Sequence, residues 1–135
     1  MIFLLDTTAF SDLMREEPRT QARVASLRAV DSVAICSVVR GEIRYGIERL
    51  PLGKRREALT EKSQRLFAAI PCEPIPPVAG DQYGLVKAAV QKLGLSLDEN
   101  DLWIAATAIV LGATLVSRDS DFRQVDRLAL ANWSE

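Results

Sequence analysis

The chain contains 135 residues, of which 26% are charged and 48% hydrophobic, and its formal net charge is −1. This composition is typical of a soluble globular protein, and we expect one domain spanning residues 1–135. The sequence contains no histidine, which excludes serine–histidine and cysteine–histidine triads and histidine-bound zinc. Any catalysis must therefore use carboxylates, hydroxyls, thiols, basic side chains or a bound metal ion.

No segment predicts export or membrane insertion. The apolar residues 2–5 end at Asp6 and lack the preceding basic residues of a secretory signal. The longest apolar stretch, residues 102–116, is too short to span a bilayer. Cys36 and Cys72 do not form a CxxC motif and are expected to be plain buried thiols. We therefore expect a cytoplasmic protein without membrane contact.

The first half of the chain alternates short apolar runs with amphipathic segments. The predicted strands in this half cover residues 2–5 and 32–36. The predicted helices cover residues 9–14, 20–28, 38–50 and 54–70. Pro18 separates the first two helices, since proline breaks a helix interior. In the helix over 20–28, Val24 and Leu27 are expected to face the core.

The same alternation continues in the second half. The predicted strands cover residues 72–75, 113–117 and 128–131, and the predicted helices cover residues 78–93 and 101–111. Strands that alternate with helices predict a parallel sheet covered on both faces. We therefore expect an α/β fold, a three-layer sandwich with a central, mainly parallel sheet of four to five strands flanked by helices.

Acidic residues fall near the carboxyl ends of these strands. Asp6 follows the first strand, Glu42 lies in the second turn of the helix after the second strand, and Asp101 opens the helix before the last buried strand. Asp119 and Asp121 come directly after that strand, in the segment SRDSDF. Functional groups of an open parallel sheet gather outside this edge. We therefore expect the four segments to bring these carboxylates together.

Clustered carboxylates repel one another unless a cation lies between them. Their hard oxygen ligands favour Mg²⁺ or Mn²⁺. Such an ion lowers the pKa of a bound water and stabilises charge on a phosphate, which indicates phosphodiester hydrolysis. Taken singly, each residue also has an ordinary structural interpretation: Asp6 and Asp101 as helix caps, Glu42 as a solvated side chain, and Asp119 and Asp121 as turn residues.

Three segments of the sequence resemble the PIN-domain ribonucleases. They are MIFLLDTTAFSDL, SVVRGEIRYGIERL and DENDLWIAATAIVLGATLVSRDSDF. Within that family they look most like the VapC toxins of toxin–antitoxin pairs, and the resemblance covers residues 2–131. It implies a Rossmann-like PIN fold, a homodimer, and a Mg²⁺- or Mn²⁺-dependent endoribonuclease. It also implies cleavage of tRNA or ribosomal RNA and neutralisation by a VapB-like antitoxin.

The resemblance assigns a role to each acidic candidate. Asp6, Glu42 and Asp101 match the first three acidic ligands of the family. The fourth falls in SRDSDF, where Asp119 is the better match and Asp121 is a helper. All five residues are therefore candidate catalytic and metal-binding residues.

Side chains beside these positions are candidates for supporting roles. Thr7 and Ser117 stand next to acidic positions and could orient them. Arg44 and Arg118 lie nearest the predicted edge and are candidates for contacts with RNA phosphates. Residues 98–99 add two acidic side chains, which we interpret as solvated, with water binding as the alternative. The apolar side chains beside Glu42 fit either the core or an antitoxin groove; they are Tyr45, Ile47 and Leu50.

Two other functions are compatible with parts of the pattern. An aspartyl-phosphate phosphatase would use Asp6 as the nucleophile. That chemistry needs a second carboxylate two residues later, but Asp6 is followed by Thr7 and Thr8. The other is a non-catalytic PIN module that binds only RNA or an antitoxin. Measurement of Mn²⁺ binding discriminates this module from the nuclease.

Overall fold

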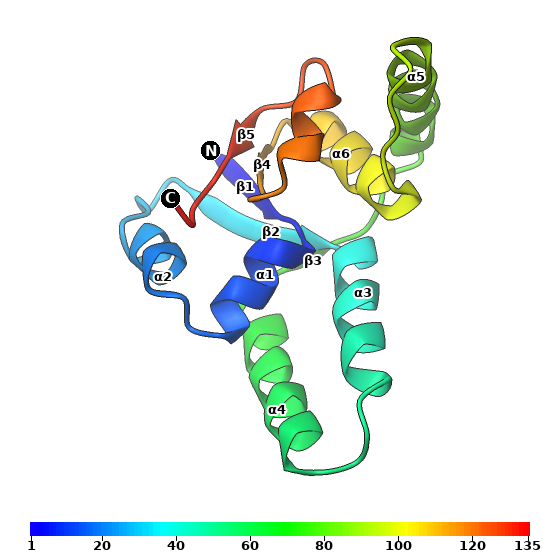
Figure 1. Cartoon of the computed structure of the whole chain (residues 1–135). Helices are drawn as coiled ribbons and strands as arrows, with labels where there is room; N and C mark the ends of the chain where they lie inside the picture. The colour runs from blue at the N-terminus through cyan, green and yellow to red at the C-terminus, as the bar shows by residue number, and fades with distance from the viewer.

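The computed structural model describes all 135 residues, which fold around a five-stranded sheet (Figure 1). The strands are β1 (Ile2–Leu5), β2 (Ser32–Cys36), β3 (Cys72–Glu73), β4 (Thr114–Val116) and β5 (Leu130–Ala131). Their order across the sheet is β3-β2-β1-β4-β5, and every neighbouring pair runs parallel. The α/β fold predicted from the alternating pattern is confirmed.

Helices cover both faces of this sheet. They are α1 (Thr7–Met14), α2 (Pro18–Ala25), α3 (Ser37–Glu48), α4 (Lys54–Ala69), α5 (Val78–Lys92), α6 (Glu99–Leu111) and the 3₁₀ helix η1 (Ser120–Gln124). Figure 1 shows α1 to α4 on one side of the sheet and α5, α6 and η1 on the other. The three-layer sandwich is therefore confirmed. None of the helices is both long and apolar enough to cross a bilayer.

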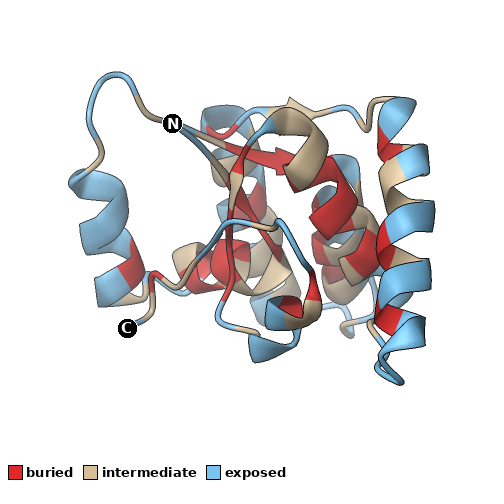
Figure 2. Ribbon diagram, turned by 90° about the horizontal axis from the view of Figure 1, so that it is seen from above, coloured by how far each residue is buried: buried red, intermediate tan, exposed pale blue.

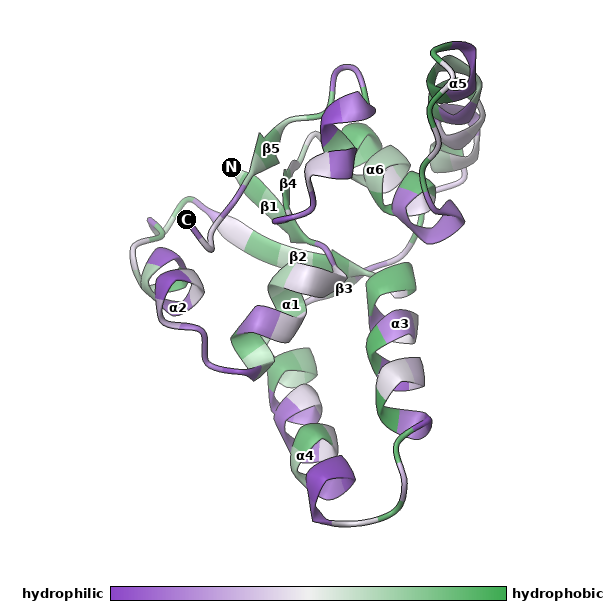
Figure 3. Cartoon of the chain, in the orientation of Figure 1, coloured by the Kyte–Doolittle hydropathy of each residue, from purple (hydrophilic) through white to green (hydrophobic).

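The strands are apolar because both faces of the sheet are covered. Leu4, Ile35 and Leu115 on three adjacent strands are fully buried. Figure 2 shows the buried residues concentrated in the sheet and on the inward sides of the helices. Figure 3 shows the same strands as hydrophobic, while α4 carries hydrophilic residues along its length. The sheet thus forms a rigid platform for the loops at its edge.

Helix α2 differs from its prediction. It begins at Pro18, with Glu17 as its N-cap, and it buries Thr20. The Thr20 hydroxyl donates to Glu17 Oε2 at 2.7 Å, so this polar side chain is satisfied inside the protein. Val24, expected to face the core, is 37% exposed, whereas Leu27 does pack against the core. The prediction is therefore confirmed for Leu27, which lies just beyond the end of α2, and wrong for Val24, although Val24 is on the same helix face as the buried Thr20.

The strand order changes direction at β1, and this position determines where loops meet. From β1 the chain proceeds outward through β2 and β3 and then returns to place β4 on the other side of β1. The N–H of Asp6 donates to the carbonyl of Val116 at 3.0 Å. The loops after β1 and β4 therefore lie side by side, at the switch point where parallel sheets bind ligands.

Candidate functional site

Asp6 is a buried carboxylate at the start of α1. Its side chain is the N-cap of the helix, accepting the N–H of Ala9 at 2.8 Å and the hydroxyl of Thr8 at 2.7 Å. The residue is 3% exposed. Burial raises the pKa of Asp6, while hydrogen bonds from Ser117, Ala9 and Thr8 act in the opposite direction. The capping interpretation is confirmed, and the same contacts fix this carboxylate at the sheet edge.

The side chain of Glu42 comes from a neighbouring helix and forms a hydrogen bond at the same end of α1. It lies in the second turn of α3, which packs against α1. The hydroxyl of Thr7 donates to Glu42 Oε1 at 2.6 Å. Thr7 is the first residue of the helix that Asp6 caps. The Thr7 contact therefore orients Glu42 beside Asp6, as the sequence suggested.

The charges that act on Asp101 come from the other three predicted segments as well as from its own. It lies in the first turn of α6, whose N-cap is Asp98, so Asp101 does not itself cap the helix as expected. Burial raises the pKa of Asp101 from 3.8 to about 7, and repulsion from Asp98, Glu42, Asp119 and Asp6 adds to that rise. Charges must be close neighbours to act on one another in this way. Asp6, Glu42 and Asp119 are therefore near enough to Asp101 to repel its charge; below, the acidic group means Asp6, Glu42, Asp101 and Asp119.

Asp119 and Asp121 differ in their relation to the group. Asp119 is half-buried, and its N–H donates to the Ser117 hydroxyl at 3.0 Å. Its Oδ1 accepts the N–H of Asp121 at 2.9 Å, which makes Asp119 the N-cap of η1. The Asp121 side chain is exposed, and the residue contacts Asp119 through its backbone. Asp119 is thus the member of SRDSDF that joins the group.

The acidic group has the chemistry of a site for a hard divalent cation. No three acidic or cysteine side chains are placed so that they could together hold a metal ion. The four carboxylates nevertheless provide only oxygen donors, and Mg²⁺ binds through one or two carboxylates together with several waters. A cation would also relieve the burial and repulsion that raise the pKa of Asp101. The donor set therefore fits Mg²⁺ or Mn²⁺.

The two acidic residues that precede Asp101 have local partners. Asp98 accepts the N–H of Asn100 at 3.2 Å. Glu99 is exposed and accepts hydrogen bonds from Tyr83 and from Lys87, the latter at 2.5 Å. Both side chains are exposed, as the sequence suggested, but they start a helix and do not belong to a loop.

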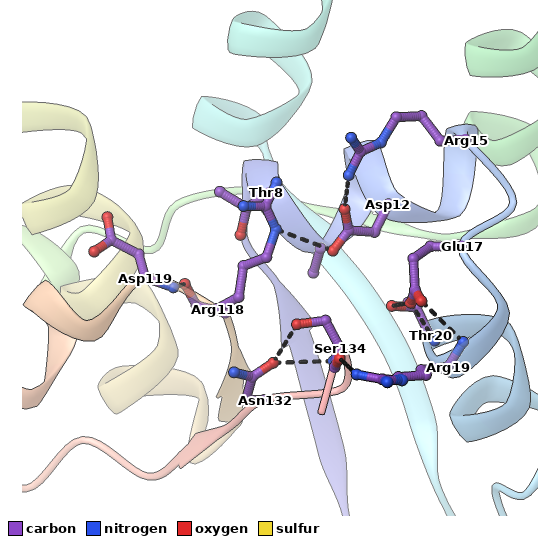
Figure 4. A network of polar contacts seen from close by, with 12 residues as sticks. Thr8, Asp12, Arg15, Glu17, Arg19, Thr20, Arg118, Asp119, Asn132 and Ser134 are labelled. Atoms are coloured by element: carbon purple, nitrogen blue, oxygen red, sulfur yellow. Dashed lines mark hydrogen bonds and ion pairs between the residues drawn. The ribbon is translucent and has the colours of Figure 1, made fainter.

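A second buried carboxylate, Asp12, was not among the residues predicted from the sequence. Asp12 is 2% exposed and accepts hydrogen bonds from Arg15 and from Arg118 Nε, the latter at 3.2 Å (Figure 4). In the sequence, Asp12 and Arg15 have the spacing of an ordinary surface ion pair, which gives no sign of burial. Arg44 pairs with Glu48 on the exposed face of α3 at 2.9 Å.

Comparison with known proteins identifies the family. Residues 3–128 match the PIN domain family. The chain belongs to this family. This PIN-domain chain is 28% identical to Ribonuclease VapC2 of Rickettsia felis, with 100% of both chains covered. It is 29% identical to Ribonuclease VapC1 of Haemophilus influenzae strain R2866, again with 100% of both covered.

A solved structure gives the same result for the fold. The crystal structure of VapBC2 from Rickettsia felis bound to a DNA fragment from its promoter contains a similar chain, with a TM-score of 0.90 and 26% identity. The match covers 98% of this PIN-domain chain and 99% of that chain. The family resemblance inferred from the three sequence segments is confirmed.

The raised pKa of Asp101 predicts a specific pH dependence of stability. Because the folded state holds this proton more tightly than the unfolded chain, the contribution of Asp101 to stability is present below its ordinary pKa of 3.8 and is lost as pH rises through about 7. Asp101→Asn cannot ionise. In metal-free buffer we expect this variant to melt above the wild type at about pH 8, and we expect the difference to shrink steadily as the pH is lowered to about 4.

The measurement is thermal unfolding followed by circular dichroism. Asp126→Asn removes one negative charge at an exposed position outside the acidic group and is the control. Equal melting shifts for both variants at the higher pH would contradict the prediction.

Proposed function

We propose that this PIN-domain protein is a Mg²⁺- or Mn²⁺-dependent endoribonuclease of the VapC toxin type. The single observation that supports it is the meeting of four carboxylates from separate segments beside β1 and β4, with repulsion that contributes to a pKa of about 7 at Asp101. The relatives named as ribonucleases support RNA as the substrate. We propose tRNA or ribosomal RNA as the target, in the cytoplasm, from the family resemblance.

In this proposal Asp6, Glu42, Asp101 and Asp119 hold the ion, with Asp121 as a helper. When bound, the ion supplies an activated water and neutralises charge on the phosphate. The protein fixes its ligands before substrate arrives, because Asp6 is held by the start of α1 and Glu42 by Thr7. A bound cation also favours the ionised form of Asp101 over the protonated form.

The groove between α1, α3 and α4 is the proposed seat of a VapB-like antitoxin. Its volume is about 660 Å³. The apolar lining consists of Met14, Ile43, Ile47, Leu50, Ala58 and Leu59, and the basic side chains on it are Arg15, Arg49, Arg55 and Lys62. Of the apolar strip singled out in the sequence, Ile47 and Leu50 line this groove, whereas Tyr45 is exposed outside it.

An amphipathic helix fits a groove of this composition, with its apolar face on the floor. Glu42 lines the same groove, so an occupant would reach the acidic group. The structural relative in the VapBC2 complex supports a partner of this type. A homodimer, implied by the resemblance, is also part of the proposal.

Removal of a proposed ligand should eliminate activity without unfolding the protein. We expect Asp6→Asn and Asp101→Asn each to lower cleavage of total cellular RNA by more than about 100-fold, the upper range for losing a residue that only orients a ligand. Assays with added Mg²⁺ or Mn²⁺ measure the cleavage, and circular dichroism checks the fold. Full activity in either variant would falsify the assigned roles. Tight partner or RNA binding with no Mn²⁺ binding would instead identify a non-catalytic module.

Asp119 and Asp121 can be separated by the same assay. Because Asp119 repels Asp101 and so lies near it, Asp119→Asn should abolish cleavage. Asp121→Asn should lower it by less than about tenfold, as expected for an indirect role. If Asp121→Asn were as damaging as Asp119→Asn, Asp121 would be a direct ligand.

The groove assignment predicts that filling it blocks the antitoxin. Ala58 is exposed on α4 and lines the groove, so Ala58→Phe adds bulk there without changing a proposed metal ligand. We expect the affinity for a cognate VapB-like antitoxin to fall by about tenfold or more, with RNA cleavage retained. Gln64→Phe, at an exposed position of α4 outside the groove, is the matched control. Equal effects of both variants on calorimetric binding would place the partner elsewhere.

A further inference from the structure

Asp12 is a buried carboxylate that two arginines share. It lies on α1, is 2% exposed, and accepts hydrogen bonds from Arg15 on the same helix and from Arg118 Nε at 3.2 Å. Figure 4 shows Arg118 extending from the loop after β4 to reach α1. A buried charge is unfavourable unless it is paired, so the protein retains this carboxylate at a free-energy cost that the arginines must offset.

The pairing holds Arg118 next to the acidic group. Along the chain, Arg118 stands between Ser117 and Asp119. Along α1, Asp12 is four residues after Thr8, whose hydroxyl donates to Asp6, and residues four apart lie on one face of a helix. Asp12, which holds the guanidinium, is therefore about one helical turn, roughly 5.4 Å, along α1 from Thr8.

Arg118 keeps donors available to a ligand. Its hydrogen bond to Asp12 uses Nε, and neither Nη1 nor Nη2 makes a hydrogen bond within the chain. The side chain is 46% exposed although its partner is buried. It also borders a hollow of about 240 Å³, whose other polar lining includes Arg123 and Asn132 as well as the acidic Asp119 and Glu135. A planar guanidinium fixed at one edge is well suited to bind a phosphate through its free edge.

An RNA strand needs such a contact here. The net charge of the chain is −1, and the acidic group repels every phosphate except one that a bound cation neutralises. Phosphates next to the cleaved one need another positive partner.

We infer that Asp12 is a positioning residue that holds Arg118 to bind an RNA phosphate adjacent to the one cleaved. This inference rests on the proposed function, since it specifies how the same site holds its substrate.

Binding of a fluorescent, single-stranded RNA of mixed sequence tests the inference. Anisotropy titrations with Mg²⁺ at several salt concentrations use Asp6→Asn as the parent, so that the RNA stays intact. Adding Arg118→Gln should weaken binding about tenfold and lower the slope of log affinity against log salt by about 0.7, the loss of one phosphate contact. Arg65→Gln, with the same charge change on the exposed surface of α4, should leave the slope unchanged.

The direction in which Asp12→Asn changes the RNA affinity distinguishes two explanations. It removes a negative charge, so a purely electrostatic effect would tighten RNA binding, whereas loss of the position of Arg118 weakens it. We expect binding several-fold weaker than in the parent. Thermal unfolding checks the fold of this variant, and the half-exposed Arg118 provides an independent test if Asp12→Asn unfolds.

Three results would overturn the inference. The first is an unchanged salt slope in Arg118→Gln. The second is tighter binding in folded Asp12→Asn. The third is no RNA binding by the parent. Cleavage of total cellular RNA by the wild type is assayed separately and shows whether the proposed function fails as well.

Discussion

The burial of carboxylates at one edge of a parallel sheet, together with the repulsion between them, is the constraint on which this structure depends. The loops after β1 and β4 lie together because those strands pair at the centre of the sheet. Burial and neighbouring charge both favour the protonated form of Asp101, and burial does the same for Asp6. The fold tolerates this arrangement because backbone and hydroxyl groups donate to Asp6 and Glu42. The protein can thus fold with these carboxylates near one another, and they remain suited to binding a cation.

The sequence predicted the parts of this site that follow from chain order. Apolar strands that alternate with helices predict a parallel sheet, and the carboxyl ends of parallel strands share one edge. Asp6, Glu42, Asp101 and Asp119 could be placed there without coordinates, because each lies shortly after a strand or on a helix next to one. The Thr7 contact with Glu42 was also foreseeable, since Thr7 opens the helix that Asp6 caps.

Features that depend on the angle between elements could not be predicted in this way. Asp12 is buried because the loop after β4 brings Arg118 over α1, and neither residue carries a local signal for that contact. The burial of Thr20 on α2 was missed, because it depends on Glu17, which satisfies the Thr20 hydroxyl. In each case a long-range or side-chain hydrogen bond decides the burial, and hydrophobic spacing does not record it.

The pairing of β1 with β4 has a consequence for synthesis of the chain. Phe3 lies opposite Thr114 in the sheet, so β1 cannot form this pairing until β4 has been synthesised. Such distant contacts form late, because a long loop has to close before they contribute any stability. On the ribosome, a nascent chain exposes Asp6 early but lacks Asp119 until the segment after β4 has emerged. Chains that stop before this segment cannot assemble the acidic group, so the topology itself delays its formation.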